Sequence, residues 1–180
     1  MKRIKMSLSQ LSSLKINNKS SKKHVHGGNY VGERTDGKMH GQGTYFYNDG
    51  SKYEGQWKND EMNGEGTFTW SCGEKYAGQW KNDLQHGYGI YIWPDGDKYE
   101  GQWEKGEKCG YGIFTWADGE TYVGHWKNDL RHGKGIHTWI DCHKYVGDWD
   151  NDIREGNGMY IYSNEKVSIG KFKNNELLTE

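Results

Sequence analysis

A period of 23 residues that never slips is the feature that most constrains this chain. Tyrosine occupies the same place in six successive units, and Ser168 stands where a seventh would fall: Tyr30, Tyr53, Tyr76, Tyr99, Tyr122 and Tyr145. Chains with a short, fixed period build one supersecondary unit per repeat and stack these units on one another. We therefore expect an elongated repeat protein.

Each unit predicts two β-strands. In the first half, glycine and tryptophan follow the tyrosine at alternate positions, and a period of two indicates a strand. These residues are Gly55, Trp57, Gly78, Trp80, Gly101, Trp103, Gly124, Trp126, Gly147 and Trp149. The second half alternates glycine with aromatic residues, as in Gly64, Gly66, Phe68 and in Gly87, Gly89, Tyr91. This alternation predicts the second strand.

The turn between units sets the register of the strands. In Pro94-Asp95-Gly96, proline suits the first central position of a type I turn and glycine supplies the left-handed residue after it. A three-residue loop of this kind places Phe68 opposite Tyr76 and Gly66 opposite Gly78. Across the turn, Gly64 then lies opposite Trp80. The aromatic side chains of neighbouring units therefore share one face of the sheet.

Inside a unit, we expect Trp80 opposite Gly87 across a six-residue connection, with Gly78 opposite Gly89 and Tyr76 opposite Tyr91. Rows of glycine let a sheet bend sharply and let rings lie against backbone. The predicted fold is all-β: an elongated, single-layer antiparallel sheet solenoid of 23-residue β-hairpins, twisted and curled into a trough. Residues 28–180 form this domain. Its six full repeats each begin at one of the periodic tyrosines, the first at Tyr30, and a terminal half repeat begins at Ser168. At about 4.8 Å per strand, it is a rod of roughly 60 Å.

Residues 1–27 form a basic tail without acidic residues. Its cations are Lys2, Arg3, Lys5, Lys15, Lys19, Lys22 and Lys23. Seven of the 24 basic residues therefore precede the repeats, which leaves 17 basic residues against 25 acidic ones. Its Ser and Asn content predicts a disordered, solvated tail. Ile4, Leu8, Leu11 and Leu14 recur at helical spacing. Two alternatives for the tail are therefore an amphipathic helix on an anionic membrane and a mitochondrial presequence.

Three segments resemble one known repeat: Tyr-Glu-Gly-Gln-Trp-Lys-Asn at 53–59, Met-Asn-Gly-Glu-Gly at 62–66 and Pro-Asp-Gly at 94–96. They are similar to the MORN (membrane occupation and recognition nexus) repeat, and the resemblance covers residues 30 to about 175. It implies a twisted antiparallel sheet with a binding or scaffolding role. Members of this family organise cytoskeletal and membrane-associated structures, form homodimers, grip partner helices in the trough and have been proposed to contact acidic phospholipids.

Catalytic, metal and cofactor sites are not expected. His40, His86, His132 and Cys109 share one repeat position, interpreted as a turn residue, but equivalent positions lie about 10 Å apart and zinc holds its ligands at about 2.0 to 2.3 Å. Each Asn-Asp loop offers one carboxylate, too few for calcium. The glycines lie inside strands, whereas a phosphate-binding loop precedes a helix. The acidic repeat body disfavours nucleic acid.

The sequence favours a non-catalytic protein-interaction scaffold that binds a partner segment along its aromatic trough or along the rim. A single curled sheet does not fully cover its own rings, and exposed apolar surface marks interaction sites. The candidate partner-binding residues are Trp70, Trp93, Trp116 and Trp139. The partner is a protein segment, with a helix as one candidate, or a second copy paired through the end strands. The alternative is peripheral binding to acidic phospholipids through the tail. The chain lacks a long apolar run and has an odd number of cysteines, three. These features predict a cytoplasmic protein. A scaffolding or lipid-binding role would place it at the cytoskeleton or at the membrane.

Overall fold

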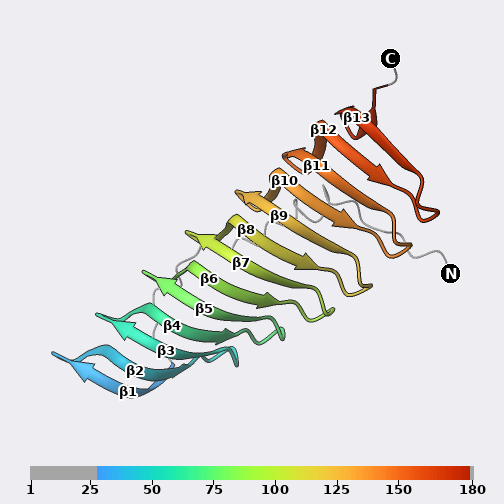
Figure 1. The fold of residues 1–180 in the computed structure, drawn as a ribbon. Helices are drawn as coiled ribbons and strands as arrows, with labels where there is room; N and C mark the ends of the chain where they lie inside the picture. The colour runs from blue at the N-terminus through green and yellow to red at the C-terminus, as the bar shows by residue number, and fades with distance from the viewer. Residues whose placement is uncertain (1–27, 179–180) are drawn as a thin grey trace.

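The computed structural model describes residues 28–178, which form one open antiparallel sheet of 14 strands hydrogen-bonded in chain order. The strands are β1 (Asn29–Thr35), β2 (Lys38–Phe46), β3 (Lys52–Lys58), β4 (Glu61–Thr69), β5 (Lys75–Lys81), β6 (Leu84–Ile92), β7 (Lys98–Glu104), β8 (Glu107–Thr115), β9 (Thr121–Lys127), β10 (Leu130–Thr138), β11 (Lys144–Asp150), β12 (Ile153–Ile161), β13 (Val167–Lys173) and β14 (Glu176–Leu177). They stand side by side along an elongated sheet (Figure 1). The predicted all-β solenoid is confirmed.

The three-residue turn between units is also confirmed. Around Pro94-Asp95-Gly96, the Trp93 N–H donates to the Asp97 carbonyl at 2.9 Å. The Gly96 N–H donates to the Trp93 carbonyl at 3.0 Å, and the φ of Gly96 is +99°. The equivalent turn at Ser71-Cys72-Gly73, in which the Gly73 N–H donates to the Trp70 carbonyl at 2.9 Å, aligns β4 and β5 as predicted, with the pairs Phe68–Tyr76, Gly66–Gly78 and Gly64–Trp80.

The connection inside a unit differs from the prediction. Trp80 lies opposite Gln85 and not opposite Gly87. Asn82 and Asp83 form a two-residue turn, with left-handed φ values of 49° and 65° that are typical of a type I′ hairpin. A bulge at Gly87, whose φ is +60°, then places two extra residues in β6. The bulge restores the predicted pairs Gly78–Gly89 and Tyr76–Tyr91.

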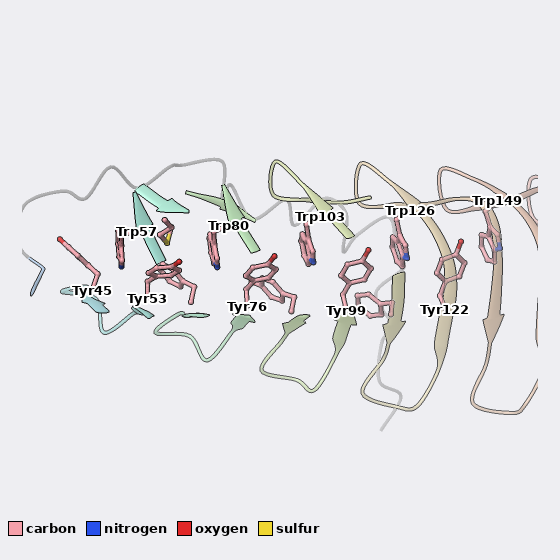
Figure 2. Close-up of a cluster of buried hydrophobic side chains, with 14 of the residues drawn as sticks. Tyr45, Tyr53, Trp57, Tyr76, Trp80, Tyr99, Trp103, Tyr122, Trp126 and Trp149 are labelled. Carbon is pink, nitrogen blue, oxygen red and sulfur yellow. The ribbon is translucent and has the colours of Figure 1, made fainter. Parts of the chain in front are cut away.

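The core consists of aromatic rings on one face of the sheet (Figure 2). The first-strand tyrosines are completely buried from Tyr53 to Tyr145, and the first-strand tryptophans are at most 6% exposed from Trp57 to Trp149. The ring of Tyr76 meets Trp80 edge-to-face at 5.0 Å and meets Trp103 of the next unit at 5.4 Å. Because such contacts recur from Tyr30–Trp57 to Tyr145–Trp149, the rings form one ladder that joins the repeats.

Glycine rows provide the floor on which these rings lie. Trp80 Nε1 donates to the Gly66 carbonyl at 3.1 Å, and Trp103 Nε1 donates to the Gly89 carbonyl at 3.2 Å. The Tyr76 hydroxyl donates to the Gln79 carbonyl at 2.9 Å. The polar groups of these first-strand rings therefore use the backbone of the sheet as their partner, which is possible only where no side chain intervenes.

Cys142 replaces the turn glycine in the fifth unit and adopts a left-handed conformation, with a φ of 66°. This conformation costs a residue with a side chain roughly 1 to 2 kcal/mol. We expect Cys142→Gly to raise the free energy of unfolding by about 1 kcal/mol, measured by thermal denaturation in reductant. Cys72→Ser, an exposed residue of another turn, should leave the melting temperature unchanged. A lower melting temperature for Cys142→Gly would contradict this account of the turn.

Candidate binding surfaces

Four tryptophans form one row at a long edge of the aromatic face, as the sequence predicts, and we call them the rim row: Trp70, Trp93, Trp116 and Trp139. They stay partly exposed. The ring of Trp93 packs 4.4 Å from Tyr91 and 5.3 Å from Phe114, between centroids. The indole of Trp93 therefore packs between rings of two successive units and still remains partly exposed.

Carboxylates lie beside the rim row in three consecutive units, at Glu74, Asp97 and Glu120. The Tyr91 hydroxyl donates to Glu74 Oε2 at 2.6 Å, and the Ala117 N–H donates to Asp97 Oδ1 at 2.8 Å. Partial burial raises the pKa of Asp97. The rim thus combines apolar edges with negative charge. Sequence analysis missed these residues, although their shared repeat position was a signal that could have found them.

The trough is filled by side chains of this chain. The residues opposite Arg34 and the first-strand tryptophans change from apolar to cationic along the rod: Met39, Met62, Gln85, Lys108, Arg131 and Arg154. Met39 and Met62 belong to the buried core. Lys108 Nζ lies 4.8 Å from the ring centroid of Trp126 and 5.2 Å from that of Phe114, and burial lowers the pKa of this lysine. These contacts are cation–π interactions, which let a charged side chain close over an aromatic core.

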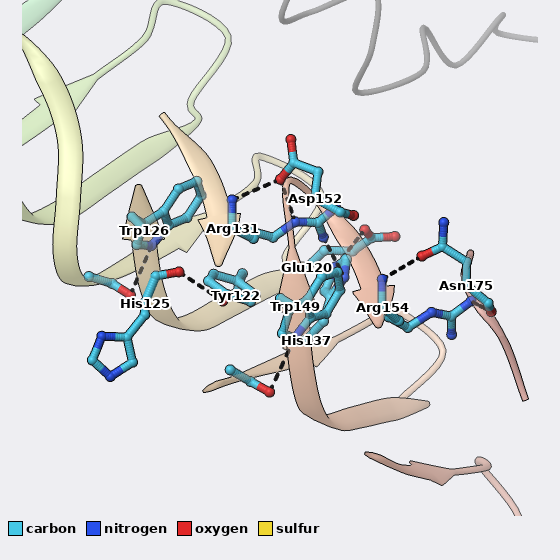
Figure 3. Close-up of polar contacts among 12 residues, drawn as sticks. Glu120, Tyr122, His125, Trp126, Arg131, His137, Trp149, Asp152, Arg154 and Asn175 are labelled. Carbon is cyan, nitrogen blue, oxygen red and sulfur yellow. Dashed lines mark hydrogen bonds and ion pairs between the residues drawn. The ribbon is translucent and has the colours of Figure 1, made fainter. Parts of the chain in front are cut away.

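A buried polar cluster interrupts the aromatic core in the fifth unit (Figure 3). His137 takes the place of a second-strand ring, is 4% exposed and stacks on Trp139 at 4.3 Å. Its Nδ1 lies 3.1 Å from Nη1 of Arg131, whose Nε is 2.9 Å from Asp152 Oδ1. Burial, with a contribution from the Arg131 charge, lowers the pKa of His137 to about 3. The imidazole is thus neutral near pH 7 and serves as a core ring.

Aspartates of the short turns link successive units. Asp83 Oδ1 accepts a hydrogen bond from the Met62 N–H, 21 residues earlier, at 2.8 Å. The same bond joins Asp60 to Met39, Asp129 to Lys108, Asp152 to Arg131 and Asn175 to Arg154. The prediction that the Asn-Asp pairs serve the turns is confirmed by their left-handed φ values. The bond to the preceding unit was not predicted.

The fourth unit has Gly106 in place of this aspartate, so the carboxylate is missing at the joint between β6 and β7–β8. Gly106 still donates its N–H to the Gln85 carbonyl at 3.0 Å, as Asp83 does to Met62. We expect Gly106→Asp to add the side-chain bond and to stabilise the rod by about 1 kcal/mol in urea denaturation. The reverse change, Asp83→Gly, should destabilise it by a similar amount. A destabilised Gly106→Asp variant would contradict this assignment.

The opposite face of the sheet carries a shallow hollow of about 1300 Å³ over β8–β13, with Val123, Ile136, Val146, Met159 and Ile169 in its lining. A smaller hollow of about 600 Å³ lies next to it, beside Cys109, His125 and His132. Both are open to solvent.

The shared His and Cys position lies within strands, so its interpretation as a turn residue was wrong. His40, His86, Cys109 and His132 belong to β2, β6, β8 and β10, because the two-residue turn ends earlier than the predicted loop. His132 Nδ1 lies 3.2 Å from Asp150 Oδ1. Within residues 28–178, no group of three or more His, Cys, Asp or Glu side chains is arranged to hold a metal ion.

The predicted membrane-binding cations Lys2, Arg3, Lys5, Lys15, Lys19, Lys22 and Lys23 lie outside the described residues. The apolar residues of the tail lie there too, so both remain predictions. In the part of the chain that the structure describes, no helix is long and apolar enough to cross a bilayer.

The fold defines a single-layer β-repeat protein whose unit is a hairpin of about 23 residues. The model of the MORN repeat matches residues 30–52, 53–73, 76–98, 99–121, 122–141 and 145–167. The chain therefore belongs to the MORN repeat family, and its resemblance to that family is confirmed. A search of curated protein sequences found no match.

Two solved structures from Drosophila melanogaster are similar to this chain. The TCP domain of SAS-4 (dCPAP), in complex with a proline-rich motif of Ana2 (dSTIL), has a TM-score of 0.47 at 13% identity, covering 74% of this chain and 73% of that chain. The TCP10c domain of Sas-4 has a TM-score of 0.38 at 12% identity, covering 74% of this chain and 93% of that chain.

Proposed function

We propose that this MORN-repeat sheet is a non-catalytic scaffold that binds a protein segment along the rim row. The observation that carries the proposal is the partial exposure of the rim tryptophans, while the first-strand rings beside them are buried. The rim tryptophans recur every two strands, or about every 10 Å. A linear segment that lies along the rod can therefore place one apolar side chain against each unit.

The carboxylates beside the rim row suggest what else such a segment carries. Glu74, Asp97 and Glu120 occupy the same position in units two to four. A partner with Lys or Arg between its apolar residues would complement this row, and complementary charge mainly increases specificity and association rate. Tryptophan is also enriched among the residues that contribute most to binding energy.

The test removes the centre of the rim row with Trp93→Ala and Trp116→Ala together. We expect at least a tenfold loss of affinity for a partner identified by affinity capture and mass spectrometry, since truncating a central interface aromatic often costs 2 kcal/mol or more. The double variant also loses ring packing, so its fold must be checked by circular dichroism. Ala117→Arg tests the same surface without removing a ring, because Ala117 is exposed beside Trp116.

Tyr88→Ala provides the matched control on the opposite face, where Tyr88 is 53% exposed. It should leave the affinity unchanged. Unchanged affinity for the folded double variant and for Ala117→Arg would refute binding at the rim row.

A further inference from the structure

An apolar ladder crosses the opposite face of the sheet in the C-terminal half. Six residues stand in direct cross-strand contact from β8 to β13: Ile113, Val123, Ile136, Val146, Met159 and Ile169. Ile113, Ile136 and Ile169 are 37%, 41% and 76% exposed. All of the six except Ile113 line the larger hollow. We call this apolar row the back ladder.

The same row is mainly polar in the N-terminal half of the sheet. There it begins at Val31 and runs through Thr44, Glu54 and Thr67, and then through Ala77 and Ile90 to Glu100. The repeat itself therefore does not require apolar residues at this position. Val123, Val146 and Met159 are partly exposed. A continuous apolar row that stays exposed or partly exposed over six strands marks an interaction surface.

The shape of the back ladder favours a narrow occupant. It is one row wide and about 24 Å long, for five strand steps of about 4.8 Å. Lys134, Asp148 and Lys171 lie beside it in the adjacent row, and Lys134 is paired with Asp148. A second copy packed face to face would bury these charges, which is costly. A single helix that follows the row leaves them at its flank.

We propose that residues 4–14 of this chain dock on the back ladder as an amphipathic helix, over β8–β10. Ile4, Leu8, Leu11 and Leu14 recur at helical spacing and would form a stripe about 15 Å long. Residues 6–14 carry no charged side chain. The net charges of the tail and the repeats are also opposite in sign, as counted above.

The tail is long enough to reach this surface. Residues 15–27 span at most about 45 Å when extended. The distance from β1 to β8 is seven strand steps, or about 34 Å, and the distance to β10 is about 43 Å. Leu14 can therefore reach Ile113, Val123 or Ile136, but not the far end of the ladder. Attachment to the same chain makes the docking intramolecular, so its extent does not depend on protein concentration.

Hydrogen–deuterium exchange of the full-length chain tests the proposal. We expect the amides of residues 6–14 to exchange at least tenfold more slowly than in a synthetic peptide of residues 1–20, at every protein concentration. Ile136→Lys and, separately, Leu11→Lys should each abolish this protection. Thr67→Lys, on the same row in the polar half, should keep it. Leu11→Lys leaves the repeats intact, so the test holds even where Ile136→Lys fails to fold.

Three outcomes would overturn the proposal. The first is exchange of residues 6–14 at the peptide rate in the wild-type chain. The second is protection that survives in a folded Ile136→Lys variant, which would place the helix elsewhere. The third is protection that rises with protein concentration alongside a doubled mass in sedimentation, which would mean that a second copy is involved.

Discussion

Gly101→Ala should unfold the middle of the rod. A Cβ atom at Gly101 would lie 2.6 Å from the Cα of Gly112 and 2.6 Å from the hydroxyl oxygen of Tyr99. The first is backbone of the paired strand, and the second belongs to a fully buried ring. Neither can move away, so the strands must separate. We expect a loss of at least about 3 kcal/mol in urea unfolding followed by tryptophan fluorescence.

Gly170→Ala is the matched control. Gly170 has the same place in the terminal half repeat, but its Cβ would meet only the Cδ1 atom of Leu177 closer than 3 Å, at 2.8 Å. This flexible side chain can rotate, so we expect a loss below about 1 kcal/mol. An equal loss in the two variants would show that the glycine rows do not act through close backbone approach.

His137→Phe should remove an acid-sensitive component of stability. Burial lowers the pKa of His137 to about 3, whereas an unfolded histidine titrates near 6.5. The unfolded chain therefore binds more protons at this residue between these pH values, and stability falls as the pH decreases below 6.5. From pH 7.5 to pH 5, this contribution amounts to about 2 kcal/mol, at 1.36 kcal/mol per pH unit.

The comparison of wild type with His137→Phe isolates this residue from other titrating groups. Glu120, Arg131 and Arg154 surround the imidazole, and all three are unchanged in the variant. We expect the wild type to lose about 2 kcal/mol more than the variant between pH 7.5 and pH 5 in urea denaturation. The reciprocal change Phe114→His should introduce a similar dependence in the fourth unit. Equal pH slopes for wild type and His137→Phe would contradict a neutral, buried histidine.

The periodic residues predicted the fold and the register between units. Trp80 opposite Gly64 followed from the parity of a three-residue turn, because the side-chain period of a strand is two. The pairing of Trp80 inside its unit could not be predicted from the sequence pattern. A two-residue turn with a bulge and a six-residue loop both place Gly78 opposite Gly89, and they differ only in whether Gln85 or Gly87 lies opposite Trp80. Propensity alone does not separate these connections; the left-handed φ values of Asn82 and Asp83 do.

The candidate site was predicted only in part. The rim row could be read from the repeat, because the tryptophans recur in phase and lie at the strand ends. Their packing between second-strand rings could not, since it depends on how sharply the sheet curls at the glycine rows. The back ladder was missed for another reason. The repeat position to which it belongs varies along the chain, from Thr44 to Ile136, and a search for invariant positions passes over it.

The repeat by itself determined an open antiparallel sheet with its rings on one face, because alternation and turn chemistry are local and recur every 23 residues. Tertiary structure decided which rings are enclosed, which cations close the trough and which face keeps an exposed apolar row. These outcomes depend on side chains from different units meeting across the curled sheet. Only the three-dimensional arrangement brings Lys108 over Trp126 or His137 beside Arg131.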